Sequence, residues 1–156
     1  MEFNGKALYF VAVKVFLRDG NKVLLTHDIW GNWELPGGRI QTHEFQKDLT
    51  EIVARKLKEE LGENVKYSDL KPTDTFFQVS RIEKIGDLSE QETRIFAIGY
   101  EAKFDGGIID IGDSHDKFEW FDIDELHPLD IQDNDWMKGL QDYLDKIRSK
   151  NDQKEA

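Results

Sequence analysis

One helical segment, residues 49–63, constrains the fold of this chain more than any other feature. Asp48 precedes it as an N-cap, Glu51 three residues later predicts a capping box, and Gly62 predicts the end of the helix. Its apolar stripe consists of Leu49, Ile52, Val53, Ala54, Leu57 and Leu61. Because such a stripe is stable only against other apolar surface, the rest of the chain must supply a core for it.

Apolar segments on both sides of this helix predict the strands that supply the core. A turn signal at residues 18–21 joins the first two segments and predicts a hairpin. The expected strands are Leu8–Leu17, Lys22–His27, Thr75–Ile82, Thr93–Phe104 and Phe118–Phe121. Residues 122–126 predict a short helical turn, and apolar spacing predicts a last amphipathic helix from Asn134 to Arg148.

Composition narrows the class of protein. The chain has 156 residues, 38% of them hydrophobic, which suits a single domain over residues 1–149 followed by a polar tail at 150–156. Its 32 acidic and 21 basic residues leave a net charge of −11, which disfavours a nucleic-acid partner. No apolar run approaches the roughly 20 residues that span a bilayer, so no membrane partner is expected. The absence of cysteine fits a cytoplasmic protein without disulfides or thiolate metal sites.

The negative charge is concentrated in the C-terminal third of the chain. Residues 105–145 hold thirteen acidic and two basic side chains, so their net charge equals that of the whole chain. One interpretation is a solvated surface that keeps the protein soluble. The other is that some of these carboxylates help to hold a divalent cation.

A second face of the 49–63 helix carries candidate chemistry. Glu59 and Glu60 lie three and four residues after Lys56, so the three head groups crowd together beside Glu63. Adjacent glutamates that follow a sharp glycine turn are suited to chelating Mg²⁺ or Mn²⁺. Such a cation bridges a polyphosphate and activates water for attack at phosphorus. On spacing alone, a solvated glutamate face is the commoner explanation.

The wider pattern resembles the signature of the Nudix hydrolases, Gx5Ex7REUxEExGU, in which U is a bulky apolar residue. Gly38, five further residues and Glu44 match its first part, and Arg55–Gly62 resembles its second part. Residues 33–40, which read Trp-Glu-Leu-Pro-Gly-Gly-Arg-Ile, resemble the entry into the loop of this family. Residues 118–126 resemble the strand and turn that close many such domains, so the resemblance covers roughly residues 7–127.

This resemblance implies a fold, a reaction and roles for particular residues. The implied fold is the Nudix α/β/α sandwich with a mixed β-sheet. The implied reaction is divalent-metal-dependent hydrolysis of a diphosphate bond in a nucleoside triphosphate or a nucleoside diphosphate-linked compound. Glu59 and Glu60 would bind Mg²⁺ or Mn²⁺, the Gly38 carbonyl would add a ligand, and Arg55 would orient the glutamates. The other motif residues, which shape the loop and the helix end, are Gly37, Glu44 and Gly62.

Two departures fall within the motif itself. Ten residues instead of seven separate Glu44 from Arg55, which indicates a three-residue insertion in the loop before the helix. Lys56 replaces a glutamate that in relatives ligates metal and can act as the base, and a positive charge there disfavours a divalent cation. The lysine ammonium either swings away from the motif glutamates or lies between them in place of the cation.

The loop before the last strand also lacks an acidic residue that many members of the family have. In many relatives it reads Asp-Glu-His, and Ser114 here takes the place of the glutamate. Serine is a poor Mg²⁺ ligand and no base at neutral pH. Nearby residues that could replace the glutamate are Asp113, His115, Asp116 and Glu119. The alternative is that both losses mark a catalytically weakened module that binds a nucleotide or a protein without turnover.

Side chains outside the motif are candidates for contact with a substrate. Arg39, Trp33 and Phe77 form the expected substrate-binding set, in which an aromatic ring stacks on a base and an arginine meets a phosphate. Further candidates of the same kinds are Trp30, Phe76, Arg18 and Arg81. No two histidines have the spacing of a metal pair, so a histidine metal site is not expected. The expected partner is a small nucleotide, and a homodimer is compatible with the family.

Overall fold

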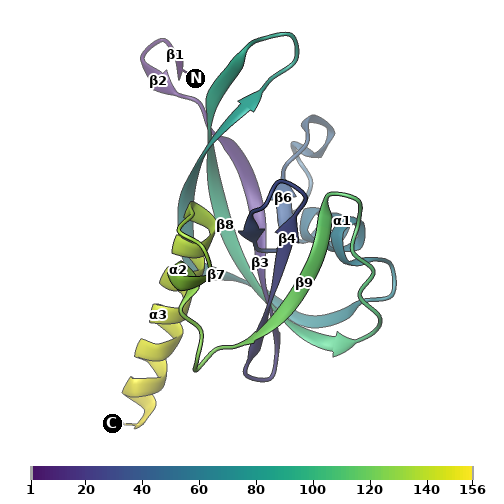
Figure 1. The fold of residues 1–156 in the computed structure, drawn as a ribbon, viewed down its shortest axis with the longest axis vertical. Coiled ribbons are helices and arrows are strands. Elements are labelled where there is room, and N and C mark those ends of the chain that lie inside the picture. Colours follow the sequence, from purple (N-terminus) through teal and green to yellow (C-terminus); the bar gives the residue numbers. More distant parts are fainter. Residues whose placement is uncertain (1, 156) are drawn as a thin grey trace.

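The computed structural model describes residues 2–155 of the chain. Its elements, in chain order, are β1 (Glu2–Phe3), β2 (Lys6–Ala7), β3 (Phe10–Asp19), β4 (Lys22–Asp28), β5 (Trp33–Glu34), β6 (Gly37–Arg39), the 3-10 helix η1 (Thr42–Glu44), α1 (Leu49–Leu61), β7 (Lys66–Lys84), β8 (Glu90–Gly106), β9 (His115–Asp122), α2 (Pro128–Ile131) and α3 (Asp135–Glu155). Strand β1 and the C-terminal part of α3 lie at opposite ends of the molecule (Figure 1).

Within residues 2–155, seven strands form one mixed sheet. Its central path runs β5-β4-β3-β8-β7, while β6 pairs with β3 and β9 pairs with β4. Strands β3 and β8 run parallel over nine paired positions, and the other strand pairs of this sheet are antiparallel. The expected hairpin of β3 and β4 is confirmed at its tip, where Arg18 faces Val23. The two strands then diverge, and β4 pairs along its whole length with β9 on its other edge.

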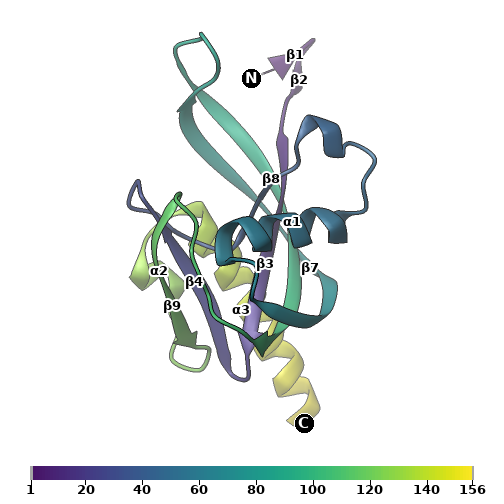
Figure 2. The ribbon, with the colours of Figure 1, turned by 90° about the vertical axis from the view of Figure 1, so that its right-hand side faces the viewer.

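Each face of the sheet is covered by one long helix (Figures 1 and 2). Successive side chains of β3 alternate between the two faces. Ala12 and Phe16 belong to the core cluster that includes α3, whereas Val13 and Val15 belong to the cluster that includes α1. These two clusters, one on each side of the sheet, confirm the expected α/β/α sandwich.

The expected capping box and the expected end of the last helix were wrong. The Asp48 side chain caps α1 by accepting a hydrogen bond from the Thr50 amide, not through a box with Glu51. Residues 122–126 form a hydrogen-bonded turn, and the short helix α2 follows it. Helix α3 runs to Glu155, beyond the expected end at Arg148, because no glycine or proline interrupts residues 149–155.

The strands β7 and β8 are also longer than expected. They exceed the expected strands at residues 75–82 and 93–104 because they pair with each other far beyond the core, from Lys66 with Gly106 to Lys84 with Glu90. The end of this two-stranded arm projects beyond the rest of the sheet (Figure 1). No helix in the described part of the chain is long and apolar enough to cross a membrane.

Candidate active site

The turn at Gly37 and Gly38 brings the loop against the central strand. Strand β6 pairs with β3, and Gly37 has a φ of 136°. A Cβ atom at Gly37 would lie 2.1 Å from the Val13 carbonyl oxygen, so only glycine permits this approach. The Gly37 amide also donates a 2.8 Å hydrogen bond to Oε2 of Glu60, which ties the loop to α1.

Lys56 lies among the motif glutamates. Its ammonium is 3.3 Å from Oε2 of Glu59 and 3.9 Å from Oε1 of Glu60. A Cβ atom on Gly38 would meet Cε of Lys56 at 2.2 Å, so the lysine side chain also covers the glycine turn. Of the two positions expected for this ammonium, the structure shows the one between the glutamates.

Arg55 joins the loop to the helix. Its Nε donates a 2.6 Å hydrogen bond to the buried Glu44, and its Nη1 donates a 3.0 Å bond to Glu59. Glu44 also accepts a hydrogen bond from the Gln41 amide. The Arg55 hydrogen bond lowers the pKa of Glu44 from 4.5 to about 2 although burial opposes the shift. These bonds suit a loop-organising role for Glu44 and an orienting role for Arg55.

A buried network stands next to the motif. Nε2 of His115 lies 2.7 Å from Oε1 of Glu34, and the Lys14 ammonium lies 3.9 Å from Oε2 of the same carboxylate. Lys14 donates a 3.0 Å hydrogen bond to the Leu35 carbonyl and lies 4.3 Å from the ring centroid of Trp136. Lys14, Glu34 and His115 are all buried, so their charges depend on one another rather than on water.

Glu34, Glu60 and His115 form one cluster of possible metal donors, with ligand atoms within 4.8 Å of one another. Burial raises the pKa of Glu60, and the charge of Glu34 adds to this shift. Burial also opposes the ionisation of Glu34, but Lys14 and His115 outweigh it and lower the pKa of Glu34. Two carboxylates whose charges oppose each other in a buried site favour a cation between them.

The cluster opens into a cleft of about 290 Å³. The cleft is lined by Ala12, Lys14, Glu34, Gly37, Gly38, Arg39, Gln41, Lys56, Glu60, Arg81, Ile95 and Trp136. Four of these side chains are cationic and two are carboxylates. This excess of positive charge suits a negatively charged group, such as a diphosphate.

The expected substrate-binding set is only partly brought together. Arg39 lines the cleft, where a bidentate ion pair with Glu83 holds its guanidinium. Phe77 is buried in the core against the ring of Trp136 and does not line the cleft. Trp33 packs edge-on against Phe121, also away from the cleft lining. Of the further candidates, Arg81 lines the cleft, whereas Trp30 and Phe76 are exposed and Arg18 lies at the far end of β3.

The acidic candidates in β9 and just before it lie outside the cluster. Asp116 is 2.7 Å from Nδ1 of His27, while Asp113 and Glu119 are exposed and absent from the cleft lining. His115, the first residue of β9, is the candidate that lies in the cluster, together with the motif glutamate Glu60 and with Glu34. The expectation from histidine spacing therefore missed this contact, because it arises between the start of β9 and strand β5.

Lys14 and Glu34 are site residues that the motif analysis did not single out. Lys14 interrupts the otherwise apolar run of the first long strand, and a charged residue in a buried strand is itself a signal. Glu34 stands in the Trp-Glu-Leu-Pro-Gly-Gly segment but has no spacing that links it to His115, which is 81 residues away. Only the fold brings these residues together.

Comparison with known proteins gives the family. No curated protein matches this chain by sequence. Among solved structures, it is similar to a MutT protein from Methanosarcina mazei Go1, with 19% identity and a TM-score of 0.63 over 93% of this chain and 96% of the other. An ADP-ribose pyrophosphatase from Streptococcus suis 89-1591 has 17% identity and a TM-score of 0.57 over 90% and 93% of the two chains. A MutT NUDIX hydrolase from Burkholderia pseudomallei has 22% identity and a TM-score of 0.56 over 77% and 88%.

At these identities the solved structures show a shared fold. The sequence model of the NUDIX domain matches residues 8–140, which is most of the chain. This match includes the glycine turn, helix α1 and the strand that carries His115. The chain therefore belongs to the Nudix family.

Proposed function

We propose that this protein hydrolyses a diphosphate bond in a nucleoside triphosphate or a nucleoside diphosphate-linked compound. The observation that carries the proposal is the buried cluster of Glu34, Glu60 and His115 at the base of a cleft with a cationic lining. The cations suit the charge of a diphosphate, and the carboxylates suit a divalent cation. Hydrolysis is also the reaction named for several structurally similar proteins.

The donor set fits Mn²⁺ or Mg²⁺. Glu34 and Glu60 offer buried carboxylate oxygens, and the imidazole of His115 favours Mn²⁺ over the harder Mg²⁺. Glu59 is less suited to hold the ion in this arrangement because it already accepts hydrogen bonds from Arg55 and Lys56. When bound, a divalent cation neutralises phosphate charge and lowers the pKa of water.

Other residues of the site would bind the phosphates, orient a metal ligand and make room for the cation. Arg81 lines the cleft, where it would pair with phosphate oxygens, whereas the buried Lys14 is engaged with Glu34 and the Leu35 carbonyl. The hydrogen bond from His115 holds the Glu34 carboxylate in one orientation. The Lys56 ammonium must withdraw from Glu60 for a cation to bind, and its four-carbon stem allows this because the side chain is 19% exposed.

The test is a hydrolysis assay with a panel of substrates in the presence of Mg²⁺ or Mn²⁺. The panel contains nucleoside triphosphates, ADP-ribose, sugar nucleotides and dinucleoside polyphosphates. We expect turnover of at least one substrate and a loss of roughly 100-fold or more in Glu60→Gln, since a group that holds charge in the site is removed. Glu63→Gln is the matched control, because this exposed glutamate lies near the end of α1 outside the cleft. No turnover of any substrate by the wild type would refute the proposal.

A second candidate function is binding of a nucleotide without turnover. The observation that favours it is the position of the Lys56 ammonium between Glu59 and Glu60, where it substitutes for a cation. In that case the wild type binds nucleotides without divalent cations and turns none over, and Lys56→Glu combined with Ser114→Glu gains hydrolysis. If Glu60→Gln abolishes a wild-type activity, this second candidate fails.

The proposal extends to the partner and the location of the protein. The net charge of −11 disfavours a nucleic-acid backbone, which leaves a small nucleotide as the proposed partner in the cytoplasm. A homodimer is a further proposal, which size-exclusion chromatography with light scattering tests directly.

A further inference from the structure

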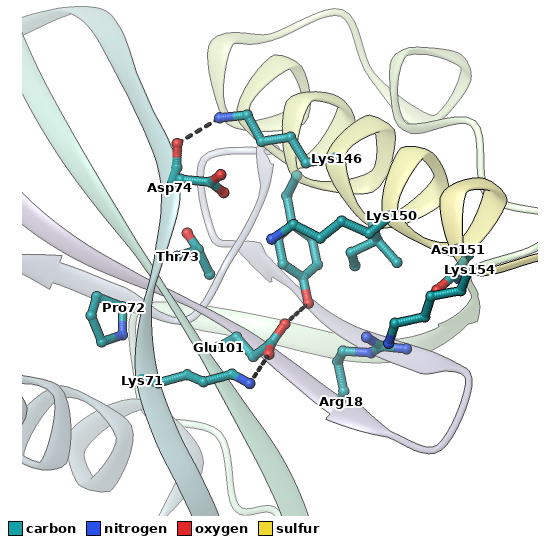
Figure 3. A pocket seen from close by; sticks show the side chains of 12 residues that line it. Arg18, Lys71, Pro72, Thr73, Asp74, Glu101, Lys146, Lys150, Asn151 and Lys154 are labelled. Atoms are coloured by element: carbon teal, nitrogen blue, oxygen red, sulfur yellow. Dashed lines mark hydrogen bonds and ion pairs between the residues drawn. The ribbon is translucent and has the colours of Figure 1, made fainter.

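A second cavity, which we call the basic pocket, lies between strand β7 and the C-terminal half of α3 (Figure 3). Its volume is about 510 Å³. The pocket is lined by Arg18, Lys71, Pro72, Thr73, Asp74, Glu101, Tyr143, Lys146, Ile147, Lys150, Asn151 and Lys154. None of these residues lines the cleft beside α1, so the two cavities are separate.

The basic pocket concentrates positive charge in an acidic protein. Five of its lining side chains are cationic and two are carboxylates, whereas the chain as a whole carries −11. Lys146, Lys150 and Lys154 follow one another at intervals of four residues, so they share one face of α3, and Figure 3 shows them extending toward the strands. Lysines near a helix C-terminus interact favourably with the helix dipole, but this explains neither Arg18 on β3 nor Lys71 on β7.

Several of these cations have no partner in the described part of the chain. Nε of Arg18 is buried without a hydrogen-bond partner there. Lys150 and Lys154 form no ion pair with any residue whose side chain is described, although Lys71 lies 3.3 Å from Glu101. Buried donors without partners are rare in native proteins, so the Arg18 guanidinium points to a missing acceptor.

The carboxylate at the base of the pocket is already engaged. The Tyr143 hydroxyl donates a 2.5 Å hydrogen bond to Oε2 of Glu101, and Lys71 pairs with its other oxygen. Burial and the charge of Glu101 raise the pKa of Tyr143, which keeps the phenol neutral. Glu101 therefore offsets part of the charge of Lys71 and Arg18, whose charges both lower its pKa, and Lys146 pairs with Asp142 at 3.1 Å. Lys150 and Lys154 keep a local excess of positive charge in the pocket.

We propose that the basic pocket binds an oligophosphate chain, either free or as the tail of a nucleoside polyphosphate. A chain of phosphates offers several acceptors in a row, which matches cations supplied by β3, β7 and successive turns of α3. An adjoining cavity of about 280 Å³ shares Arg18, Lys71 and Glu101, so there is room for an extended ligand. Phe16 stacks on Tyr143 with ring centroids 3.9 Å apart and lies between Lys14 and Arg18 on β3, which separates this site from the cleft.

The test is titration of the full chain with inorganic tripolyphosphate without divalent cations, followed by calorimetry and by two-dimensional ¹H–¹⁵N NMR. We expect binding with a Kd below about 1 mM and the largest shifts at Thr73, Asp74 and Lys146–Lys154. Lys150→Glu combined with Lys154→Glu should weaken binding by about tenfold or more. Both lysines are exposed, so the double variant should fold. Lys47→Glu combined with Lys84→Glu is the control, because it changes the net charge equally at exposed positions outside both cavities.

Three outcomes would overturn the proposal. They are no binding by the wild type, shifts confined to Gly37, Gly38 and the rest of the cleft, or equal weakening in the control variant. A parallel titration with a nucleoside triphosphate in an Arg81→Gln background distinguishes the two sources of the phosphate chain. Tighter binding of the nucleotide at the basic pocket indicates a nucleotide tail, and equal binding indicates that the free chain suffices.

Discussion

Lys14 and Arg18 lie four residues apart on the same side of β3, under the same helix α3, yet their charged groups have different surroundings. The Lys14 end is buried, and its cation has a carbonyl, a carboxylate and an indole ring as neighbours. At the Arg18 end, Nε has no partner in the described part of the chain, and the lysines of α3 approach it from outside. One end therefore balances its charges internally, and the other leaves positive charge for a ligand or solvent.

Burial explains the difference. A charge removed from water needs compensating partners, or the free-energy cost is several kcal/mol. Trp136 and Leu35 enclose Lys14, whereas the C-terminal part of α3 is exposed from Ser149 to Lys154 and leaves water access to the Arg18 end. The same strand and helix therefore support an interdependent polar network around Lys14 and a more exposed cluster of cations around Arg18.

The largest expected effect tests the interdependence of the Lys14 end. Glu34→Ala removes the carboxylate partner of both Lys14 and His115 and leaves two buried groups without it. We expect the free energy of unfolding to fall by about 3–5 kcal/mol, as measured by urea denaturation. Glu101→Ala at the other end should cost about 1 kcal/mol, because it removes a tyrosine hydrogen bond and a partly exposed ion pair. Equal losses in the two variants would contradict the comparison.

Much of the fold was predictable from local patterns. The apolar stripe of α1, its cap at Asp48 and its end at Gly62 are local features, and the structure confirms them except at Ala54, which was expected to face the core and is exposed. The long arm of β7 and β8 was not predictable in full, because its outer residues alternate without burying an apolar face. The end of α3 was missed for a similar reason, since polar residues of good helix propensity show no periodicity.

The site was predictable only where its residues are close in sequence. The motif spacing predicts the contacts of Arg55 and Lys56 with Glu59, since residues three and four apart on a helix are neighbours. The contact between His115 and Glu34 crosses 81 residues and depends on the pairing of β4 with both β5 and β9. No pattern along a single sequence encodes that register.

The next prediction concerns the Lys56 ammonium, which lies between the carboxylates of Glu59 and Glu60. If the Lys56 ammonium occupies the place of a divalent cation, Lys56→Gln should bind Mg²⁺ about tenfold to 100-fold more tightly than the wild type. Calorimetric titration with MgCl₂ measures the difference. Lys150→Gln removes an equal charge at the Arg18 end and serves as the control, with no expected change. Equal affinity in Lys56→Gln and the wild type would show that Lys56 does not compete with the ion.

A smaller expected effect depends on pH and concerns Glu44, in the loop that Arg55 ties to α1. The pKa of Glu44 is about 2 in the folded chain, against 4.5 ordinarily, because Arg55 donates hydrogen bonds to it. Its contribution to stability is present in full above pH 4.5 and is lost as the pH falls toward 2. Urea denaturation between pH 6 and pH 3 should therefore show a steeper loss for the wild type than for Glu44→Gln. Parallel pH profiles in the two proteins would rule out this contribution.

The smallest expected change in the free energy of unfolding is at the Arg18 end, where the lysines of α3 are not expected to stabilise the fold. Lys150→Ala and Lys154→Ala remove exposed side chains without ion pairs in the described part of the chain, so each should change the free energy of unfolding by no more than about 0.5 kcal/mol. Two opposing terms keep the change small, because the helix dipole favours these lysines and their mutual repulsion disfavours them. Urea denaturation at low and high salt measures both terms, and a loss above 1 kcal/mol would show a structural role. A cluster of cations that does not stabilise the fold is free to change its rotamers and its ligands without unfolding the protein, which the buried Lys14 end cannot do.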